Sequence, residues 1–341
     1  MVVFRKLRRL FALFFLVLLA GLQSPGKSEA GETRRILLQQ ARTWMYQIQD
    51  INSEHAIQAL ADTDYPLLVV EPNYNDRDNT FDCRFMVRAL GKTINGAKRL
   101  VLAYVDIGQA ENWRTYWKKE WVAPTFRKGG DPDFLVTPDP DGWEGCYPVA
   151  YWDQRWKDIW LGPGGIIPEL AKLGFDGVYL DWVGAYDDEH VREAARQSNV
   201  NPGLEMIRFI EEIGRAGKEV TEGFLVIPQN APFLIDEAPD RYAKAIDALA
   251  VEDTWFHGAG DADWYDPKAG DLRTRYDGQW STDRQLLQYR KYLKRGLPVF
   301  SVDYCVKQEN AAMVYREARK AGLRPLVTRV SLSRITKTPP R

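Results

Sequence analysis

The chain has 341 residues, of which 45% are hydrophobic and 27% are charged, and its formal net charge is −1. This is an ordinary globular composition, with enough length for one large domain or two small ones. A chain this close to neutral lacks the excess of basic residues that nucleic-acid binding requires, so nucleic acid is excluded as the expected partner.

The first 30 residues differ from the rest and predict a secretory signal peptide at residues 1–30. Four basic residues within positions 5–9 precede an almost uninterrupted apolar run at 10–22, and Ser28 and Ala30 are small residues at the positions a signal peptidase reads. The apolar run is short for a membrane span, which needs about 20 residues. We therefore expect cleavage, secretion to the extracellular or periplasmic side and no membrane association afterwards; an uncleaved anchor is the alternative.

Cleavage would leave a single domain at residues 31–341 that is more acidic than the whole chain. The segment removed carries five basic residues and one acidic residue, so the net charge falls from −1 to −5. That charge tolerates a cationic partner. In an oxidising compartment, one pair of the three cysteines is expected to form a disulfide. Cys83 and Cys146 are the favoured pair because both fall in or near predicted loops, which leaves Cys305 over.

Eight short apolar, β-prone runs alternate with helix-like stretches along the domain. The predicted strands are residues 44–49, 67–71, 99–107, 177–181, 224–228, 248–252, 299–303 and 325–330, and the predicted helices are 53–61, 80–90, 168–173, 202–217, 281–295 and 310–321. Eight strands alternating with helices predict an α/β fold, a single (β/α)8 TIM barrel. An open doubly wound sheet is the rival, but no glycine-rich turn follows the first strand.

Two connections are long and rich in aromatic residues. Residues 111–161 follow the third strand and residues 257–280 follow the sixth. Insertions of this length are usually functional loops, and both leave the carboxyl ends of strands. We expect about half of their rings to pack within the loops and the others to be candidate platforms for sugars. The rings belong to Trp113, Tyr116, Trp117, Trp121, Trp143, Tyr147, Tyr151, Trp152, Trp156, Trp160, Trp264, Tyr265 and Tyr276.

Acidic residues end several of the predicted strands, although Asp and Glu are poor strand formers. They are Glu71, Asp106, Asp181, Glu252, Asp253 and Asp303. Asp181 and Glu252 each end an apolar run and are followed by a tryptophan, Trp182 and Trp255, within three residues. Structural roles are the alternative for others: Asp253 would bind a loop backbone, and Glu71 would begin a loop.

Two strand-ending acids suggest glycoside hydrolysis. That reaction needs one carboxyl group to protonate the leaving oxygen and a second to attack the anomeric carbon or activate water. Strands four and six lie nearly opposite each other across a barrel mouth, and crowded acids raise each other's pKa. Other chemistries lack their motifs. With three histidines and no zinc-binding, nucleophile-elbow or phosphate-loop pattern, we expect no metal and no cofactor.

Several motifs in the same order give the chain a resemblance to glycoside hydrolase family 114, a group of secreted barrels similar to endo-α-1,4-polygalactosaminidase. The resemblance covers roughly residues 44–330. Its motifs are WMYQIQ from Trp44, AYVDIGQAE from Ala103, YWD from Tyr151, FDGVYLD from Phe175 with Tyr186, IPQN from Ile227, VE from Val251 and VDY from Val302.

The resemblance implies that Asp181 and Glu252 are the catalytic pair of an endo-acting enzyme. The implied substrate is an α-1,4-linked galactosamine-rich polysaccharide, whose free amines suit an acidic cleft, and we expect a monomer. Which acid carries the proton, and whether the anomeric configuration is retained, stay open. The expected substrate-binding residues are Asp106, Tyr46, Tyr104, Trp182, Tyr186, Asn230, Trp255, Asp303 and Tyr304.

The third-strand motif departs from the family. It usually reads Ser-Ile-Gly-Glu, whereas this chain has Asp106, Ile107, Gly108 and Gln109. The exchange leaves the catalytic pair intact but puts the identity of the glycan in doubt. Asp106 would then bind a sugar amine or hydroxyl, or compensate for the charge missing at Gln109. The alternatives are a barrel that binds carbohydrate without catalysis and a glycosidase that acts on a different glycan.

Overall fold

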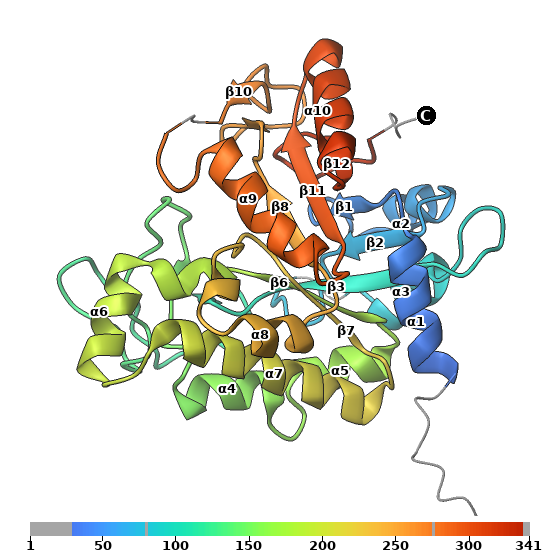
Figure 1. The fold of residues 1–341 in the computed structure, drawn as a ribbon. Coiled ribbons are helices and arrows are strands. Elements are labelled where there is room, and N and C mark those ends of the chain that lie inside the picture. The colour runs from blue at the N-terminus through green and yellow to red at the C-terminus, as the bar shows by residue number, and fades with distance from the viewer. Residues whose placement is uncertain (1–28, 79–80, 275–276, 337–341) are drawn as a thin grey trace, which may run out of the picture.

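The computed structural model describes residues 29–78, 81–274 and 277–336. It is an α/β fold in which parallel strands alternate with helices (Figure 1). Each of the eight predicted strands is present. They are β1 (Met45–Gln47), β2 (Leu67–Val70), β3 (Leu100–Asp106), β6 (Gly177–Asp181), β7 (Leu225–Pro228), β8 (Leu249–Glu252), β11 (Val299–Tyr304) and β12 (Arg324–Thr328).

These strands form two parallel sheets that meet edge to edge. One has the order β1-β2-β3-β6-β7 and the other the order β12-β11-β8. At one junction, Gln229 bridges to Ala250, and the Asn230 N–H donates to the Ala250 carbonyl at 3.0 Å. At the other, the Trp44 indole N–H donates to the Arg324 carbonyl at 3.0 Å. Consecutive strands of the sequence are therefore neighbours in space, and their carboxyl ends face the same side.

The helices cover the outside of the strands, and the six that the sequence predicts are all present. They are α2 (Glu54–Ala61), α3 (Cys83–Leu90), α5 (Ile166–Leu173), α7 (Pro202–Val220), α9 (Thr282–Leu293) and α10 (Gln308–Lys320). Two of them have well-defined caps. Ser53 accepts the Ala56 N–H at 3.2 Å at the start of α2. Gly174 ends α5 with φ of 106°, a left-handed conformation that favours glycine.

Four helices were not predicted: α1 (Glu29–Gln40), α4 (Gln154–Leu161), α6 (Glu189–Gln197) and α8 (Pro239–Ala245). Two have acidic caps that the sequence displays. Asp153 accepts the Arg155 N–H at 2.8 Å, and Asp188 accepts the His190 N–H at 2.9 Å. Helices α4, α5, α7 and α8 pack together along the outside of β6 and β7 (Figure 1).

Aromatic side chains fill the space between the two sheets. Trp44 stacks on Tyr46 with ring centroids 6.1 Å apart, and it meets Phe300 of β11 edge-on at 5.6 Å. Tyr46 lies 5.0 Å from Tyr179 of β6. These rings are almost completely buried, so they fix the spacing of the strands and support the residues that follow at the carboxyl ends.

The two long connections contain short antiparallel strand pairs. In the connection after β3, β4 (Gln109–Glu111) pairs with β5 (Cys146–Pro148). In the one after β8, β9 (Phe256–His257) pairs with β10 (Leu272–Arg273). Many of the rings are structural: Trp156, Tyr151 and Trp160 are buried in the core. Trp143 and Tyr265 are more than half exposed, and Tyr276 lies outside the described residues.

The favoured disulfide is wrong, because all three cysteines are free. Cys83 begins α3, where its thiol donates to the Pro72 carbonyl at 2.7 Å. Cys146 lies on β5, and Cys305 is buried just after β11. Two cysteines in predicted loops need not be neighbours, since loops leave the sheet in different directions.

The predicted signal peptide lies outside the described residues, apart from Glu29 and Ala30, where α1 begins. Among the described helices, none combines the length and the apolar character that crossing a membrane requires.

Candidate active site

Asp181 and Glu252 end β6 and β8, the two strands that flank β7. Both side chains lie at the carboxyl ends of parallel strands, the end at which barrel enzymes hold their active sites. The fold therefore brings together two acids that are 71 positions apart in the sequence, as the sequence predicts.

Asp181 accepts one hydrogen bond on each carboxylate oxygen. The Tyr104 hydroxyl, from neighbouring β3, donates to Oδ2 at 2.5 Å, and the Trp182 N–H donates to Oδ1 at 2.7 Å. Burial raises the pKa of Asp181, while these two bonds lower it. The local backbone is unusual, because Trp182 has φ of 52°. A Cβ at Gly108 would lie only 2.1 Å from the Trp182 carbonyl oxygen, so this approach requires glycine.

Glu252 is held by side chains from both neighbouring strands. Asn230, just after β7, donates its amide to Oε2 at 2.8 Å, and its own Oδ1 accepts the Glu252 N–H at 2.8 Å. The Tyr304 hydroxyl of β11 donates to Oε1. Burial and then the nearby Asp181 raise the pKa of Glu252, the Tyr304 and Asn230 bonds lower it, and together these effects bring it to about 7. Near neutral pH this carboxyl group is poised between its two protonation states.

Asp106 and Asp303 are buried acids whose carboxylates bind backbone. Asp106 Oδ1 accepts the Gly108 and Gln109 N–H groups at 3.0 and 2.9 Å, and the side chain turns the chain from β3 into β4. Asp303 Oδ1 accepts the Trp255 and Phe256 N–H groups at 2.6 and 2.8 Å. Both residues hold loops at the carboxyl ends of the strands. The substrate contacts expected of them remain predictions.

The other predicted substrate-binding residues fall into two groups. Tyr46, Trp255 and Tyr304 are buried, with exposed fractions of 2%, 8% and 4%. Trp182, Tyr104, Tyr186 and Asn230 are partly exposed. Tyr186 belongs to the short 3-10 helix η1 (Val183–Asp187) that follows Asp181. Of the two predicted platforms, Trp182 is therefore accessible and Trp255 packs into the core.

A family model for the glycoside hydrolases of family GH114 matches residues 27–340. The chain belongs to family GH114. It is accordingly a glycosidase, and the family resemblance of its motifs is confirmed. An uncharacterized protein of Deinococcus radiodurans is 31% identical over 82% of this chain and 78% of its own. A second uncharacterized relative, from Methanocaldococcus jannaschii, is 31% identical over 63% of this chain, which spans only 57% of that relative.

Two solved structures have a similar fold at low sequence identity. Aspergillus fumigatus Ega3, in complex with galactosamine, is 16% identical with a TM-score of 0.56, over 86% of this chain and 92% of its own. The glycoside hydrolase domain of PelA from Pseudomonas aeruginosa is 14% identical with a TM-score of 0.56, over 86% of this chain and 96% of its own.

The GH114 chain also contains a buried ion cluster that sequence reasoning missed. Arg114 donates to both Glu71 oxygens at 3.0 Å and to Glu111 at 2.7 and 3.3 Å. Its guanidinium also donates to Asn75 at 3.2 Å. The cluster joins the loop after β2 to the long connection after β3. Glu111 and Arg114 are three residues apart, which is a local signal, but the pairing with Glu71 depends on the fold.

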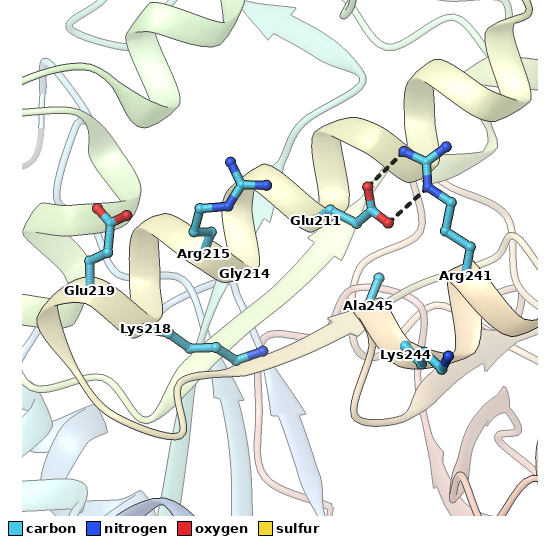
Figure 2. Close-up of a pocket in the computed structure, with 8 residues that line it drawn as sticks. All are labelled: Glu211, Gly214, Arg215, Lys218, Glu219, Arg241, Lys244 and Ala245. Atoms are coloured by element: carbon cyan, nitrogen blue, oxygen red, sulfur yellow. Dashed lines mark hydrogen bonds and ion pairs between the residues drawn. The ribbon is translucent and has the colours of Figure 1, made fainter. Parts of the chain in front are cut away.

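A separate hollow is lined by residues of α7 and α8 (Figure 2). Both helices run toward the strands that follow them, so the residues near their carboxyl ends lie beside the amino ends of β7 and β8. In Figure 2, Arg241 points toward Glu211 and donates to its two oxygens at 2.8 and 2.7 Å. Two acids line this hollow, Glu211, which Arg241 neutralises, and Glu219, and the hollow lies at the opposite end of the strands from Asp181.

Proposed function

We propose that this GH114 glycosidase cuts within an α-1,4-linked, galactosamine-rich polysaccharide and uses Asp181 and Glu252 as its catalytic pair. One observation carries the proposal. Two half-buried acids end β6 and β8, their bonded partners are hydroxyl, amide and N–H donors, and the pKa of one of them is raised to about 7. Such a pair meets the requirement of glycoside hydrolysis for one protonated and one ionised carboxyl group.

Glu252 is the proton donor in this proposal. Its raised pKa keeps a fraction protonated at neutral pH, so it protonates the glycosidic oxygen as the bond to the anomeric carbon breaks. Asp181 is the ionised partner, since Tyr104 and the Trp182 N–H donate to its two oxygens and stabilise the negative charge. Asp181 then attacks the anomeric carbon or removes a proton from the attacking water.

A cationic sugar suits the charges around Asp181. Electrostatic repulsion from Asp181 and Glu111 contributes, after burial, to the raised pKa of Asp106, so the three carboxyl groups share one region. A protonated amine brought into that region would reduce their mutual repulsion. The galactosamine in the Ega3 complex, a protein of similar fold, agrees with this choice of substrate.

The architecture and location of the enzyme are part of the same proposal. The edge contacts between the two sheets favour a closed (β/α)8 barrel, in which Asp181 and Glu252 end the strands on either side of β7, at the same mouth. The basic and apolar pattern of residues 1–30 favours secretion of a mature domain, residues 31–341, that acts as a monomer.

Reducing-end release from three glycans tests the proposal. The purified chain would be incubated with α-1,4-linked galactosamine polymer, with its N-acetylated form and with a neutral galactan. We expect release of internal fragments from the first, and no release by Asp181→Asn. Release from the neutral galactan alone would overturn the choice of substrate. Binding of the galactosamine polymer without release would support a carbohydrate-binding barrel instead.

A further inference from the structure

Trp143 is the most exposed tryptophan of the described residues, with 55% of its surface accessible. It lies in the connection after β3, in a turn that spans residues 139–143 and leads into β5. The edge of its ring rests on the connection after β8: a Cβ at Gly260 would come within 3.1 Å of Trp143 Cζ2. The indole therefore joins the connections that follow two strands of the site.

The same turn lies close to the strand that carries Asp181. Gln109, whose side-chain amide donates to Asp139, also donates its backbone N–H to Asp106 at 2.9 Å, and Asp106 lies opposite Asp181 in the register of β3 and β6. Asp139 also contributes, after burial, to the raised pKa of Asp181. Residues 139–143 are thus anchored at the carboxyl ends of β3 and β6, beside Asp181.

A buried pair, Gln109 and Asp139, fixes this turn. The Gln109 amide donates to Asp139 Oδ2, and Asp139 Oδ1 accepts the Asp141 and Trp143 N–H groups at 2.8 and 3.0 Å. The exposed fractions of Gln109 and Asp139 are 2% and 4%. A glutamate at position 109, as in the usual family motif, would place two carboxylates together without water, which is strongly unfavourable.

We propose that Trp143 is a specificity-determining platform on which a sugar ring beside the scissile bond stacks, and that Gln109 and Asp139 are its positioning residues. A pyranose presents a face of C–H groups that suits an aromatic ring, and an indole offers the largest such ring. The departure from the family motif at Gln109 and the placement of Trp143 are then linked. The Gln109 amide binds the Asp139 carboxylate, and that carboxylate binds the backbone of the turn that carries Trp143. This inference rests on the proposed function for its ligand.

Calorimetric titration with an α-1,4-linked galactosamine hexasaccharide tests the platform. Each change would be made in the non-cleaving Asp181→Asn background, so that binding is measured without hydrolysis. Trp143→Ala is expected to weaken binding about tenfold, the scale of one good aromatic contact. Trp143→Phe should recover most of the affinity. Phe126→Ala is the control, since that exposed ring lies in the same connection and is 69% accessible.

An exchange of charges tests the positioning residues. Gln109→Glu alone is expected to weaken binding to the degree that Trp143→Ala does. Adding Asp139→Asn should restore binding, because the Oδ1 of the new amide would keep the two N–H groups of the turn while its NH2 group donates to the new carboxylate. A double variant that binds no better than Gln109→Glu would overturn the positioning role, and if Gln109→Glu does not fold, the double variant is compared directly with the parent.

The outcomes separate this inference from the proposed function. If the parent chain cleaves the galactosamine polymer and Trp143→Ala binds the hexasaccharide as tightly as its background, only the platform is wrong. If the parent chain neither cleaves the polymer nor binds the hexasaccharide, the substrate proposal fails and the platform fails with it.

Discussion

The acids at the two ends of the parallel strands have different partners. At the amino ends, acids have cations or backbone N–H groups as partners. Asp176, before β6, bonds Arg34 at 2.7 Å and accepts the Val101 N–H at 3.1 Å. Asp247, before β8, pairs with Arg35 at 3.3 Å and accepts the Val226 N–H at 3.0 Å. These interactions tie α1 to strands far away in the sequence.

At the carboxyl ends, the acids of the proposed site have no cation. Within the described ranges, no ion pair involves Asp106, Asp181, Glu252 or Asp303, and burial raises the pKa of each. Arg114 neutralises only Glu71 and Glu111, farther out along the connections. Unpaired buried carboxylates are costly. The difference agrees with the proposed function, in which the amino ends serve stability and the carboxyl ends keep destabilising charges for catalysis.

Removing either of the proposed catalytic acids should give the largest effect. Asp181→Asn and Glu252→Gln are each expected to lower kcat/KM by about 10³-fold or more, the scale of general acid–base catalysis. At pH 5 the free energy of unfolding should stay within about 1 kcal/mol of the parent, because each new amide keeps one oxygen as acceptor and its NH2 group can donate to the tyrosine hydroxyl that donated to the carboxylate. Reducing-end assays and urea unfolding measure both. Glu189→Gln, an exposed acid of α6, is the matched control. Activity retained by either acid variant would contradict the assignment.

Breaking an ion pair at the amino ends of the strands should lower stability and leave catalysis unchanged. Asp176→Ala leaves Arg34 without its carboxylate and the Val101 N–H without its acceptor, so we expect a loss of about 3 kcal/mol in the free energy of unfolding. The kcat/KM of the folded fraction should be unchanged. Urea unfolding followed by circular dichroism tests this. Asp236→Ala, which removes the exposed pair with Lys291, should have little effect. If Asp176→Ala and Asp236→Ala lower the free energy of unfolding equally, the stabilising role of the acids at the amino ends is wrong.

The smallest expected effect is a shift in the pH profile of kcat/KM, which the pKa of Glu252 sets. As proton donor with a pKa near 7, it makes activity fall as pH rises past 7. Tyr304→Phe removes a bond that stabilises the carboxylate, so the pKa rises and the fall in activity moves to higher pH. Profiles of kcat/KM against pH measure the shift. An unchanged profile would mean that Glu252 does not set this limb.

The same pKa shift affects stability. The folded-state pKa of Glu252 lies above its ordinary value of 4.5, so its contribution is present below pH 4.5 and lost as pH rises toward 7. The free energy of unfolding of Glu252→Gln, relative to that of the parent, should therefore be higher at pH 8 than at pH 4. Urea unfolding at both pH values checks the sign.

The sequence by itself determined the eight strands, six helices and the positions of Asp181 and Glu252. These follow from local signals: apolar period, caps such as Ser53 and Gly174, and acids placed directly after apolar runs. Only the tertiary structure decided which backbone groups the carboxylates of Asp106 and Asp303 bind, that the cysteines stay apart, and that Trp143 rests on Gly260. Each of these depends on which distant backbone groups approach a side chain, and that is fixed by the packing of strands and connections rather than by any neighbour in the sequence.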